Sequence, residues 1–408
     1  MTEEIKLNWN IDKMPFTREL FKLVNKYKPG LEFQIQYLIL IPLSARMVGG
    51  RGVLIIESMG TGKGASIKGT THLLDKLETI FVGRITESGF LDIIKYLESK
   101  NPKRFKADDM DFELRIEDLS MTASKDYILE PTMNTASILI SDRALGLCTD
   151  DIFRTFKDNI SDLSGLTVKI KSMAVIMGGT NEIMYKIRRK LPSYRTMVHD
   201  RFTEYYPIKT KEQNEYIDWA IVNKLKREGV ETVDRLDDLE LRNMIYKIMP
   251  KRKLPDTILP FADNITEDLF NTICRDTYRR QHTRIRASYY LKGDLSALAW
   301  LNGSSTIELC HLAFFMLYYP NISVLHKCST GIQSITQLCN STASLSELAY
   351  ELELAPKDIR DILFDYNRRY GKKKNPTMIY NKNVVLNPSF NKWLIRQEQF
   401  IKECMGED

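Results

Sequence analysis

Paired cysteines are missing from this sequence. Its six cysteines lie far apart along the chain, and no two of them form a C-x-x-C pair. Zinc sites and disulfide frameworks both depend on cysteines at short, regular spacings. The sequence therefore argues against a cysteine metal site and against a disulfide framework, and it favours the reducing cytoplasm as the compartment of the protein.

A long apolar run is missing as well. A membrane-spanning helix needs about 18 or more consecutive apolar residues. The longest apolar patch here, Tyr37 to Leu43, contains Pro42 and ends before Ser44. The N-terminal stretch is polar, with acidic residues at its start, so we expect no secretory signal. The chain is therefore predicted to have no membrane partner.

The composition is that of a globular protein with enough chain for a large core. The 408 residues are 43% apolar and 27% charged, and a chain of this length usually forms two or three domains. The net charge of +6 is mildly basic, which permits a nucleic-acid partner without identifying one. The sequence contains no internal repeat and no low-complexity segment.

A turn with two glycines and a lysine is the feature around which the rest of the chain is organised. Four apolar residues, Val53 to Ile56, are typical of a buried parallel strand, and the apolar spacing from Ala65 to Leu77 predicts a helix. Between them lies the turn Gly60-Thr61-Gly62-Lys63. In such a unit the backbone N–H groups and the helix N-terminus face an anion, and the lysine adds a positive charge. The unit therefore predicts a phosphate-binding site.

The turn departs from the full phosphate-binding pattern G-x-x-x-x-G-K-[ST] at two positions. Glu57 stands where the pattern has its first glycine, and Gly64 stands where it has the hydroxyl that binds Mg²⁺. Ser66 lies two residues further on. It is a poor substitute for that hydroxyl because it points about 200° around the helix. The residues therefore predict nucleotide binding and leave hydrolysis open.

Strands and helices alternate through the first half of the chain. The expected strands cover residues 53–57, 79–85, 112–116, 167–177 and 202–208, and the expected helices cover residues 32–47, 65–77, 88–99, 125–146 and 182–190. This alternation predicts an α/β fold with a parallel sheet and helices on both of its faces. Ligands of such sheets bind at the carboxyl ends of the strands, where the glycine–lysine turn would lie.

Beyond residue 209 the pattern becomes helical. Expected helices cover residues 211–227, 235–248 and 267–292, and a tight turn separates two more, 345–352 and 356–370. Three lysines and two short apolar stretches follow, which completes the outline of a winged helix. The predicted division is an N-terminal leader at 1–30, a nucleotide-binding core at 31–208, a helical lid at 209–300 and a winged-helix domain at 301–408.

The glycine–lysine turn and the elements after it resemble the AAA+ ATPases. The residues from Glu57 to Gly64 are similar to the G-P-P-G-T-G-K-T form of the P-loop in that family. The resemblance spans roughly residues 30–300 and implies an AAA+ core with a helical lid that binds ATP and Mg²⁺. The residues implied to bind the nucleotide are Gly60, Thr61, Gly62, Lys63, Gly64 and, from the lid, Arg286.

The resemblance also implies carboxylates at the end of a later strand, the Walker B element, which hold Mg²⁺ and orient the attacking water. Two segments compete for this role. The first ends in Glu117 and Asp118, and the second contains Asp142, which is followed by Arg143 instead of a second carboxylate. We favour the first, because residues 125–146 then form the helix that precedes the next strand. Asp118 is taken as the metal ligand, although the residues leave open which of the two carboxylates faces the metal.

Three polar residues are implied in further roles. Asn181, or else Thr180, follows an apolar strand and is similar to the sensor 1 residue, which contacts the γ-phosphate or the attacking water. Arg201, or else Arg195, precedes the last strand and is similar to the arginine finger, which reaches the nucleotide of a neighbouring subunit. A homo-oligomer is therefore expected. Arg286 matches the arginine of the sensor 2 helix, although the residues around it match loosely.

The C-terminal segment carries the predicted contacts to double-stranded DNA. They are Lys357, Arg360, Lys372, Lys373 and Lys374. On the second helix of this segment three aspartates offset the basic residues, which weakens a major-groove assignment, whereas the three consecutive lysines suit phosphate contacts. Core, lid and winged helix in this order resemble the archaeal and eukaryotic origin-recognition initiators. Transposition helper ATPases and AAA+ regulators of mobile elements or viruses share the core.

The leading hypothesis is an ATP-binding AAA+ protein that acts as a nucleotide-dependent switch or initiator on duplex DNA. The second hypothesis is a degenerate, non-hydrolysing scaffold that uses its winged helix to bind protein. A helicase-type motor is the third, and it is disfavoured because the sequence has no D-E-x-[DH] box and no second repeat of a motor core.

Overall fold

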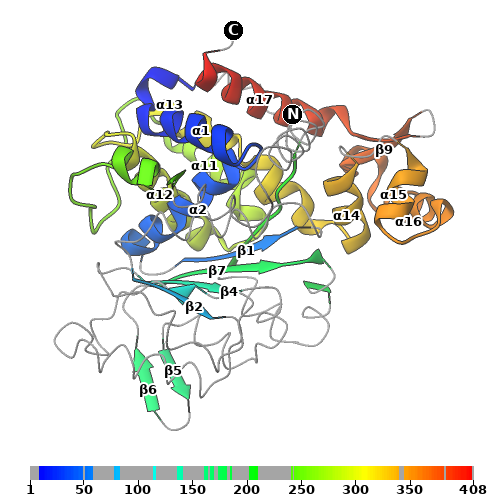
Figure 1. The fold of residues 1–408 in the computed structure, drawn as a ribbon, viewed down its shortest axis with the longest axis horizontal. Coiled ribbons are helices and arrows are strands. Elements are labelled where there is room, and N and C mark those ends of the chain that lie inside the picture. The colour runs from blue at the N-terminus through cyan, green and yellow to red at the C-terminus, as the bar shows by residue number, and fades with distance from the viewer. Residues whose placement is uncertain are drawn as a thin grey trace.

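The computed structural model combines a parallel β-sheet, a layer of helices on one face of that sheet and a C-terminal module beyond the strand ends (Figure 1). The residues that it describes are 9–48, 51–57, 78–82, 114–115, 136–140, 160–163, 166–169, 173–181, 184–185, 202–209, 240–241, 243–339, 344–380 and 383–406. The glycine–lysine turn lies outside them. The predicted α/β class with a parallel sheet is confirmed.

Five strands of the sheet follow one another in the order β2-β4-β7-β1-β8, and every pair along this path is parallel. They are β1 (Arg51–Ile56), β2 (Glu78–Val82), β4 (Ala136–Ile140), β7 (Met173–Gly179) and β8 (Phe202–Tyr205). A short strand, β3 (Leu114–Arg115), also pairs with β4. The register sets Ile56 of β1 opposite Gly179 of β7, and Ile55 opposite Tyr205 of β8. The strand that precedes the glycine–lysine turn therefore has a neighbour on both sides.

Two predicted elements within the sheet differ from the structure. The helix expected at 125–146 is wrong at residues 136–140, which form β4 between β2 and β7. Periodicity alone cannot tell a short apolar run in a strand from one in a buried helix, and here pairing on both sides decides for the strand. The strand expected at 167–177 is split, because β6 (Leu166–Lys169) turns back to pair with β5 (Ile160–Leu163) before β7 begins.

The helix expected at 267–292 is interrupted between α11 (Glu267–Asp276) and α12 (Arg284–Leu301). The interruption brings Gln281 to the edge of β8 that faces away from β1. Its side-chain amide accepts a hydrogen bond from Glu204 N at 2.7 Å and donates one to Glu204 O at 2.8 Å. A strand edge without partners leaves N–H and C=O groups unsatisfied. The break in the helix therefore closes this edge of the sheet.

A buried helix, α2 (Glu32–Val48), lies directly against the sheet (Figure 1). All but two of its 17 residues are buried, and its middle, from Tyr37 to Leu43, is apolar on every side. It packs against β1 and β7 and also against α12. At Gly293 of α12 an added Cβ atom would lie 2.5 Å from Ser44 Oγ, so glycine is required at this helix crossing.

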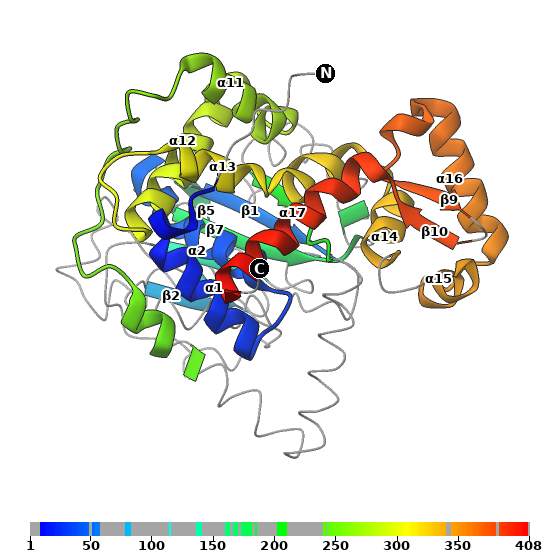
Figure 2. The ribbon, with the colours of Figure 1, turned by 90° about the horizontal axis from the view of Figure 1, so that it is seen from above.

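Helices from distant parts of the chain complete this layer. They are α1 (Pro15–Tyr27), α11, α12, α13 (Leu309–Met316) and α17 (Pro388–Met405). α1 comes from the segment predicted as a leader, and α17 comes from the segment predicted as the winged-helix domain. Both nevertheless contribute to one continuous hydrophobic core, and Figure 2 shows α17 running from the C-terminal module back towards α1. None of the helices in the described residues is long and apolar enough to cross a membrane.

Four phenylalanines form the centre of this shared core. Phe21, Phe33, Phe314 and Phe400 come from α1, α2, α13 and α17, and the centroids of their contacting rings lie 4.9 to 6.1 Å apart. Aromatic pairs at such separations add to the free energy gained from burying their surface. The four helices are therefore held together by one cluster.

Arg51, the first residue of β1, is tied to α12 by a buried ion pair. Its Nη2 atom lies 3.1 Å from Asp294 Oδ2, and neither side chain is exposed. Nη2 also donates to Tyr278 Oη at 2.8 Å, Nη1 donates to Thr203 Oγ1 at 2.7 Å, and the guanidinium lies 3.9 Å from the centre of the Tyr290 ring. Burial lowers the pKa of Arg51, but the Asp294 carboxylate and the surrounding tyrosine side chains together outweigh burial and raise this pKa. The amino end of β1 is thus fixed to the helical layer.

The C-terminal module consists of three helices and a hairpin. They are α14 (Thr330–Leu338), α15 (Leu345–Glu351), α16 (Pro356–Tyr370), β9 (Thr377–Tyr380) and β10 (Asn383–Leu386). Pro356 stands at the start of α16, and Gly371 ends that helix with a φ of 85°, a backbone angle that favours glycine. Figures 1 and 2 both show the module beside the ends of the strands. The predicted sequence of helix, turn, helix and hairpin is present.

Candidate functional site at the carboxyl edge of the sheet

The connections of the sheet diverge at β1 and β7. From β1 the chain proceeds to β2, which lies beyond β7 and β4, and from β7 it proceeds in the opposite direction to β8, on the far side of β1. In open α/β sheets, ligands bind outside the carboxyl ends of the strands where the connections diverge in this way. The candidate site therefore lies beyond Ile56 of β1 and Gly179 of β7, which are neighbours in the sheet.

Glu57 follows β1 at this edge and faces a lysine from the segment after β8. Its side chain is 2% exposed, and its Oε1 atom lies 3.3 Å from Lys209 Nζ. Its backbone N–H continues the ladder between the two strands by donating to Gly179 O at 3.1 Å. The negative charge that replaces the first glycine of the phosphate-binding pattern is therefore balanced by Lys209, which reduces its repulsion of a phosphate group.

Helix α14 of the C-terminal module is joined to the same edge through Gln337. The Nε2 atom of Gln337 donates to the carbonyl oxygens of Ile56, at 2.8 Å, and Pro207, at 3.2 Å. Its Oε1 atom accepts from Asn181 Nδ2 at 2.8 Å. Asn181 Nδ2 also donates to Ser334 Oγ at 3.1 Å. One helix of the module thus contacts the ends of β1 and β7 and the chain after β8.

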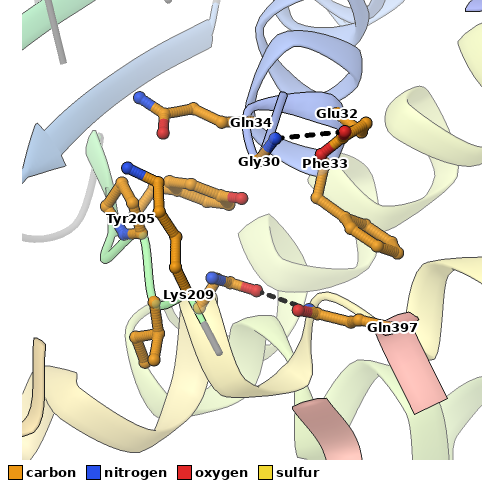
Figure 3. Close-up of a pocket in the computed structure, with 10 residues that line it drawn as sticks. Gly30, Glu32, Phe33, Gln34, Tyr205, Lys209 and Gln397 are labelled. Atoms are coloured by element: carbon orange, nitrogen blue, oxygen red, sulfur yellow. Dashed lines mark hydrogen bonds between the residues drawn. The ribbon is translucent and has the colours of Figure 1, made fainter. Parts of the chain in front are cut away.

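A cavity of about 20 Å³ lies next to Lys209 at the start of α2 (Figure 3). Glu32 lies on its wall, and its Oε1 atom accepts hydrogen bonds from Asn25 Nδ2 at 2.9 Å and Gly30 N at 3.1 Å. Burial raises the pKa of Glu32. In Figure 3 the Lys209 side chain runs past Tyr205. A water molecule needs roughly 10–15 Å³ of such space, so this cavity has room for water and not for a nucleotide base.

The structure describes two of the residues predicted for the nucleotide site. Asn181 lies at the carboxyl edge, 4% exposed and next to Thr180, the alternative to it. Arg286 lies half-buried near the start of α12, a helix whose Tyr290 and Asp294 contact Arg51 at the amino end of β1. The other predicted residues lie outside the described residues, as do the alternatives Asp142 and Arg195. They are Gly60, Thr61, Gly62, Lys63, Gly64, Glu117, Asp118 and Arg201.

The predicted DNA contacts are all exposed on the C-terminal module. Lys357 and Arg360 lie on α16, away from the side of the helix that buries Ile359 and Leu363. The three lysines 372–374 form a single 3₁₀ turn between α16 and the hairpin. Within the described part of the chain no carboxylate pairs with these three lysines. Their positive charge is therefore open to an anionic partner.

No sequence pattern predicts the other residues at the edge. Lys209 belongs to no motif, and Ser334 and Gln337 lie in a segment whose polar residues outnumber its apolar ones. Sequence alone does not distinguish a buried glutamine from an exposed one. Gln337 is buried by strand ends that are distant from it in the chain. Within the residues that the structure describes, no three His, Cys, Asp or Glu side chains are grouped to hold a metal ion.

A search against protein-family models finds no match to this chain, and a search of curated proteins finds none either.

Proposed function

We propose that the chain is an ATP-binding protein of the AAA+ type that acts as a nucleotide-dependent switch or initiator on duplex DNA. The observation that carries the proposal is the coincidence of two independent features. The connections of the sheet diverge at β1 and β7, and the sequence motif Gly60-Thr61-Gly62-Lys63 follows β1 four residues after its last residue, Ile56. Fold and sequence therefore point to the same edge for an anionic ligand.

The chain supplies groups for binding phosphate at this edge. Backbone N–H groups of the glycine-containing turn and the Lys63 ammonium would hold the phosphates, and Asn181 would donate to the terminal phosphate or to a water beside it. Because Lys209 balances Glu57, the altered P-loop remains compatible with an anion. Hydrolysis has weaker support, since Gly64 offers no hydroxyl to Mg²⁺.

Carboxylates from neighbouring strands would hold Mg²⁺, which would neutralise phosphate charge. Glu117 and Asp118, after the two-residue strand β3, remain the proposed pair, although the helix that favoured them over Asp142 is replaced at residues 136–140 by β4. The position of β4 supports Asp142 as well. β4 ends at Ile140, opposite Met177 of β7, so the chain after it starts at the same edge of the sheet as Asn181.

Replacing Lys63 with alanine tests the nucleotide site. Loss of a hydrogen bond to a charged phosphate is expected to weaken ATP binding by about tenfold to a hundredfold, measured by titration with a fluorescent ATP analogue. Lys68→Ala removes the same charge five residues further on and should leave the affinity unchanged. Equal affinities of wild type and Lys63→Ala, or no binding by either, would contradict the proposal.

Replacing Lys372, Lys373 and Lys374 together with alanine tests the DNA surface. If each lysine contacts one phosphate, the slope of log K against log salt concentration should fall by about 2.7, at 0.9 per lost contact. Duplex binding is measured by fluorescence anisotropy over a range of salt concentrations. The matched control replaces three exposed lysines outside the C-terminal module, Lys247, Lys251 and Lys253, and should keep the wild-type slope. Unchanged binding in the first triple variant would rule out the wing as the DNA contact.

One observation favours the second function, a non-hydrolysing scaffold that binds protein. The outward side of α16 carries Phe364, which is 61% exposed, and Asp365 binds both Arg368 and Arg369 at 2.6 and 2.8 Å. These ion pairs reduce the positive charge that the helix can offer to DNA. ATP binding without turnover, together with no salt-sensitive duplex binding, would select the scaffold over the switch.

A further inference from the structure

The geometry points to α14 as a latch on the nucleotide site: Ser334 and Gln337 occupy the donor group of Asn181 that a terminal phosphate would need. This inference rests on the proposed function, because it concerns the regulation of the same site. It identifies two positioning residues, contributed by the C-terminal module, that act on the nucleotide only through Asn181.

The hydrogen bonds fix which end of each amide faces the other. The carbonyl oxygens of Ile56 and Pro207 can only accept, so the donor end of Gln337 faces them, at 2.8 and 3.2 Å. The acceptor end of Gln337 consequently faces Asn181, and Asn181 must turn its Nδ2 group towards α14. Gln337 is 5% exposed and Asn181 is 4% exposed, so water has little access to compete for these bonds.

Because Asn181 Nδ2 has only two hydrogen atoms, α14 and a phosphate group would compete for them. The Nδ2 group of an asparagine carries two hydrogens. One is donated to Gln337 Oε1 and the other to Ser334 Oγ. A phosphate group at neutral pH is an acceptor, so Asn181 can donate to it only after giving up a bond to α14. Nucleotide binding therefore weakens the attachment of α14, and a firmly attached α14 weakens nucleotide binding to the same degree.

The competition would couple the nucleotide site to the proposed DNA-binding surface through α14. α14 contacts both α16 and the hairpin strand β9. A nucleotide that displaces α14 from the strand ends would change how the rest of the C-terminal module is held against the sheet. ATP is expected to have this effect and ADP is not, since the contact involves the terminal phosphate of ATP.

Ser334→Ala is the sharpest test, because it releases one hydrogen of Asn181 and leaves the bonds of Gln337 to the two carbonyl oxygens in place. The affinity for ATP, measured by isothermal titration calorimetry on the full chain, should rise about two- to tenfold, the value of one hydrogen bond. The affinity for ADP should stay the same. Thr336→Val is the matched control, since the Thr336 hydroxyl donates to Ile332 O within α14 and, among the described residues, makes no hydrogen bond to Asn181 or to a strand.

A double-mutant cycle with Asn181→Ala separates the latch from a general loosening of α14. Without the Asn181 amide, adding Ser334→Ala should no longer change the affinity for ATP. A gain that persists in the Asn181→Ala background, or an equal gain in Thr336→Val, would overturn the latch. If the wild type binds ATP and Ser334→Ala binds it no better, the latch fails alone. If neither protein binds ATP, the proposed function fails, and the latch fails with it.

Discussion

Asp294→Ala is expected to lower the free energy of unfolding by about 3–5 kcal/mol, the usual cost of removing one partner from a buried ion pair. The change leaves the Arg51 guanidinium buried and charged, with only hydroxyl groups and aromatic rings around it. The deficit is large because Asp294 is the carboxylate that holds the charge of Arg51 in place. The measurement is urea unfolding followed by far-UV circular dichroism.

Two comparisons isolate this effect from the mere loss of an aspartate. Asp256→Ala breaks an ion pair with Arg46, in which the aspartate side chain is 59% exposed, and should cost less than about 1 kcal/mol. The double variant Arg51→Met, Asp294→Leu removes both buried charges and should recover much of the loss, since the cost comes from the unpaired charge. Equal losses for Asp294→Ala and Asp256→Ala would show that the buried pair has no special weight.

Acidification from pH 7 to pH 5 is expected to cost about 2 kcal/mol of stability through His311 alone. The side chain is fully buried, and burial lowers its pKa from 6.5 to about 4. Its Nδ1 atom accepts a hydrogen bond from Glu308 N at 2.9 Å, which only the neutral ring can do. Between pH 6.5 and pH 4 the unfolded chain therefore binds the proton more readily than the folded chain. Stability falls as the pH is lowered through this window.

His311→Gln removes the titration and keeps the hydrogen bond. Glutamine is a usual residue at this third helical position, where its side chain accepts from the backbone N–H of the N-cap residue. The free energy of unfolding is measured by urea titration at pH 7 and at pH 5 for both proteins. The loss on acidification should be about 2 kcal/mol smaller in the variant. The same pH dependence in both proteins would mean that folding does not lower the pKa of His311.

Much of the architecture follows from short-range patterns. The alternation of apolar strands and helices predicted the parallel sheet, and the segments for α2, α15 and α16 were located close to their observed bounds. β4 was missed because its five residues, Ala136–Ile140, are too few to show a strand period and were joined to a longer helical pattern. The break before α12 was missed for another reason. It places Gln281 against the backbone of Glu204 in β8, and the local sequence does not show that contact.

The residues of the candidate site were likewise predicted only in part. Asn181 was predicted from its position after an apolar strand, and the structure brings it to the expected edge. Lys209, Ser334 and Gln337 were not predicted, because each is defined by a partner more than 100 residues away in the chain. In the sequence the charge of Glu57 counts against phosphate binding, whereas in the structure the ion pair with Lys209 offsets this charge. Local sequence locates the strand ends, but only the fold shows which distant side chains contact them.

The shared core of α1 and α17 has a consequence for synthesis of the protein. Trp9 Nε1 donates to Glu403 Oε2 at 2.6 Å across 394 positions, and Phe21 of α1 packs against Phe400 of α17 at 5.2 Å. During translation, α1 and the apolar helix α2 emerge long before the residues that cover them. Such long-range contacts slow folding and leave apolar surface exposed to aggregation in the meantime. The nascent chain should therefore depend on chaperones until α17 has left the ribosome.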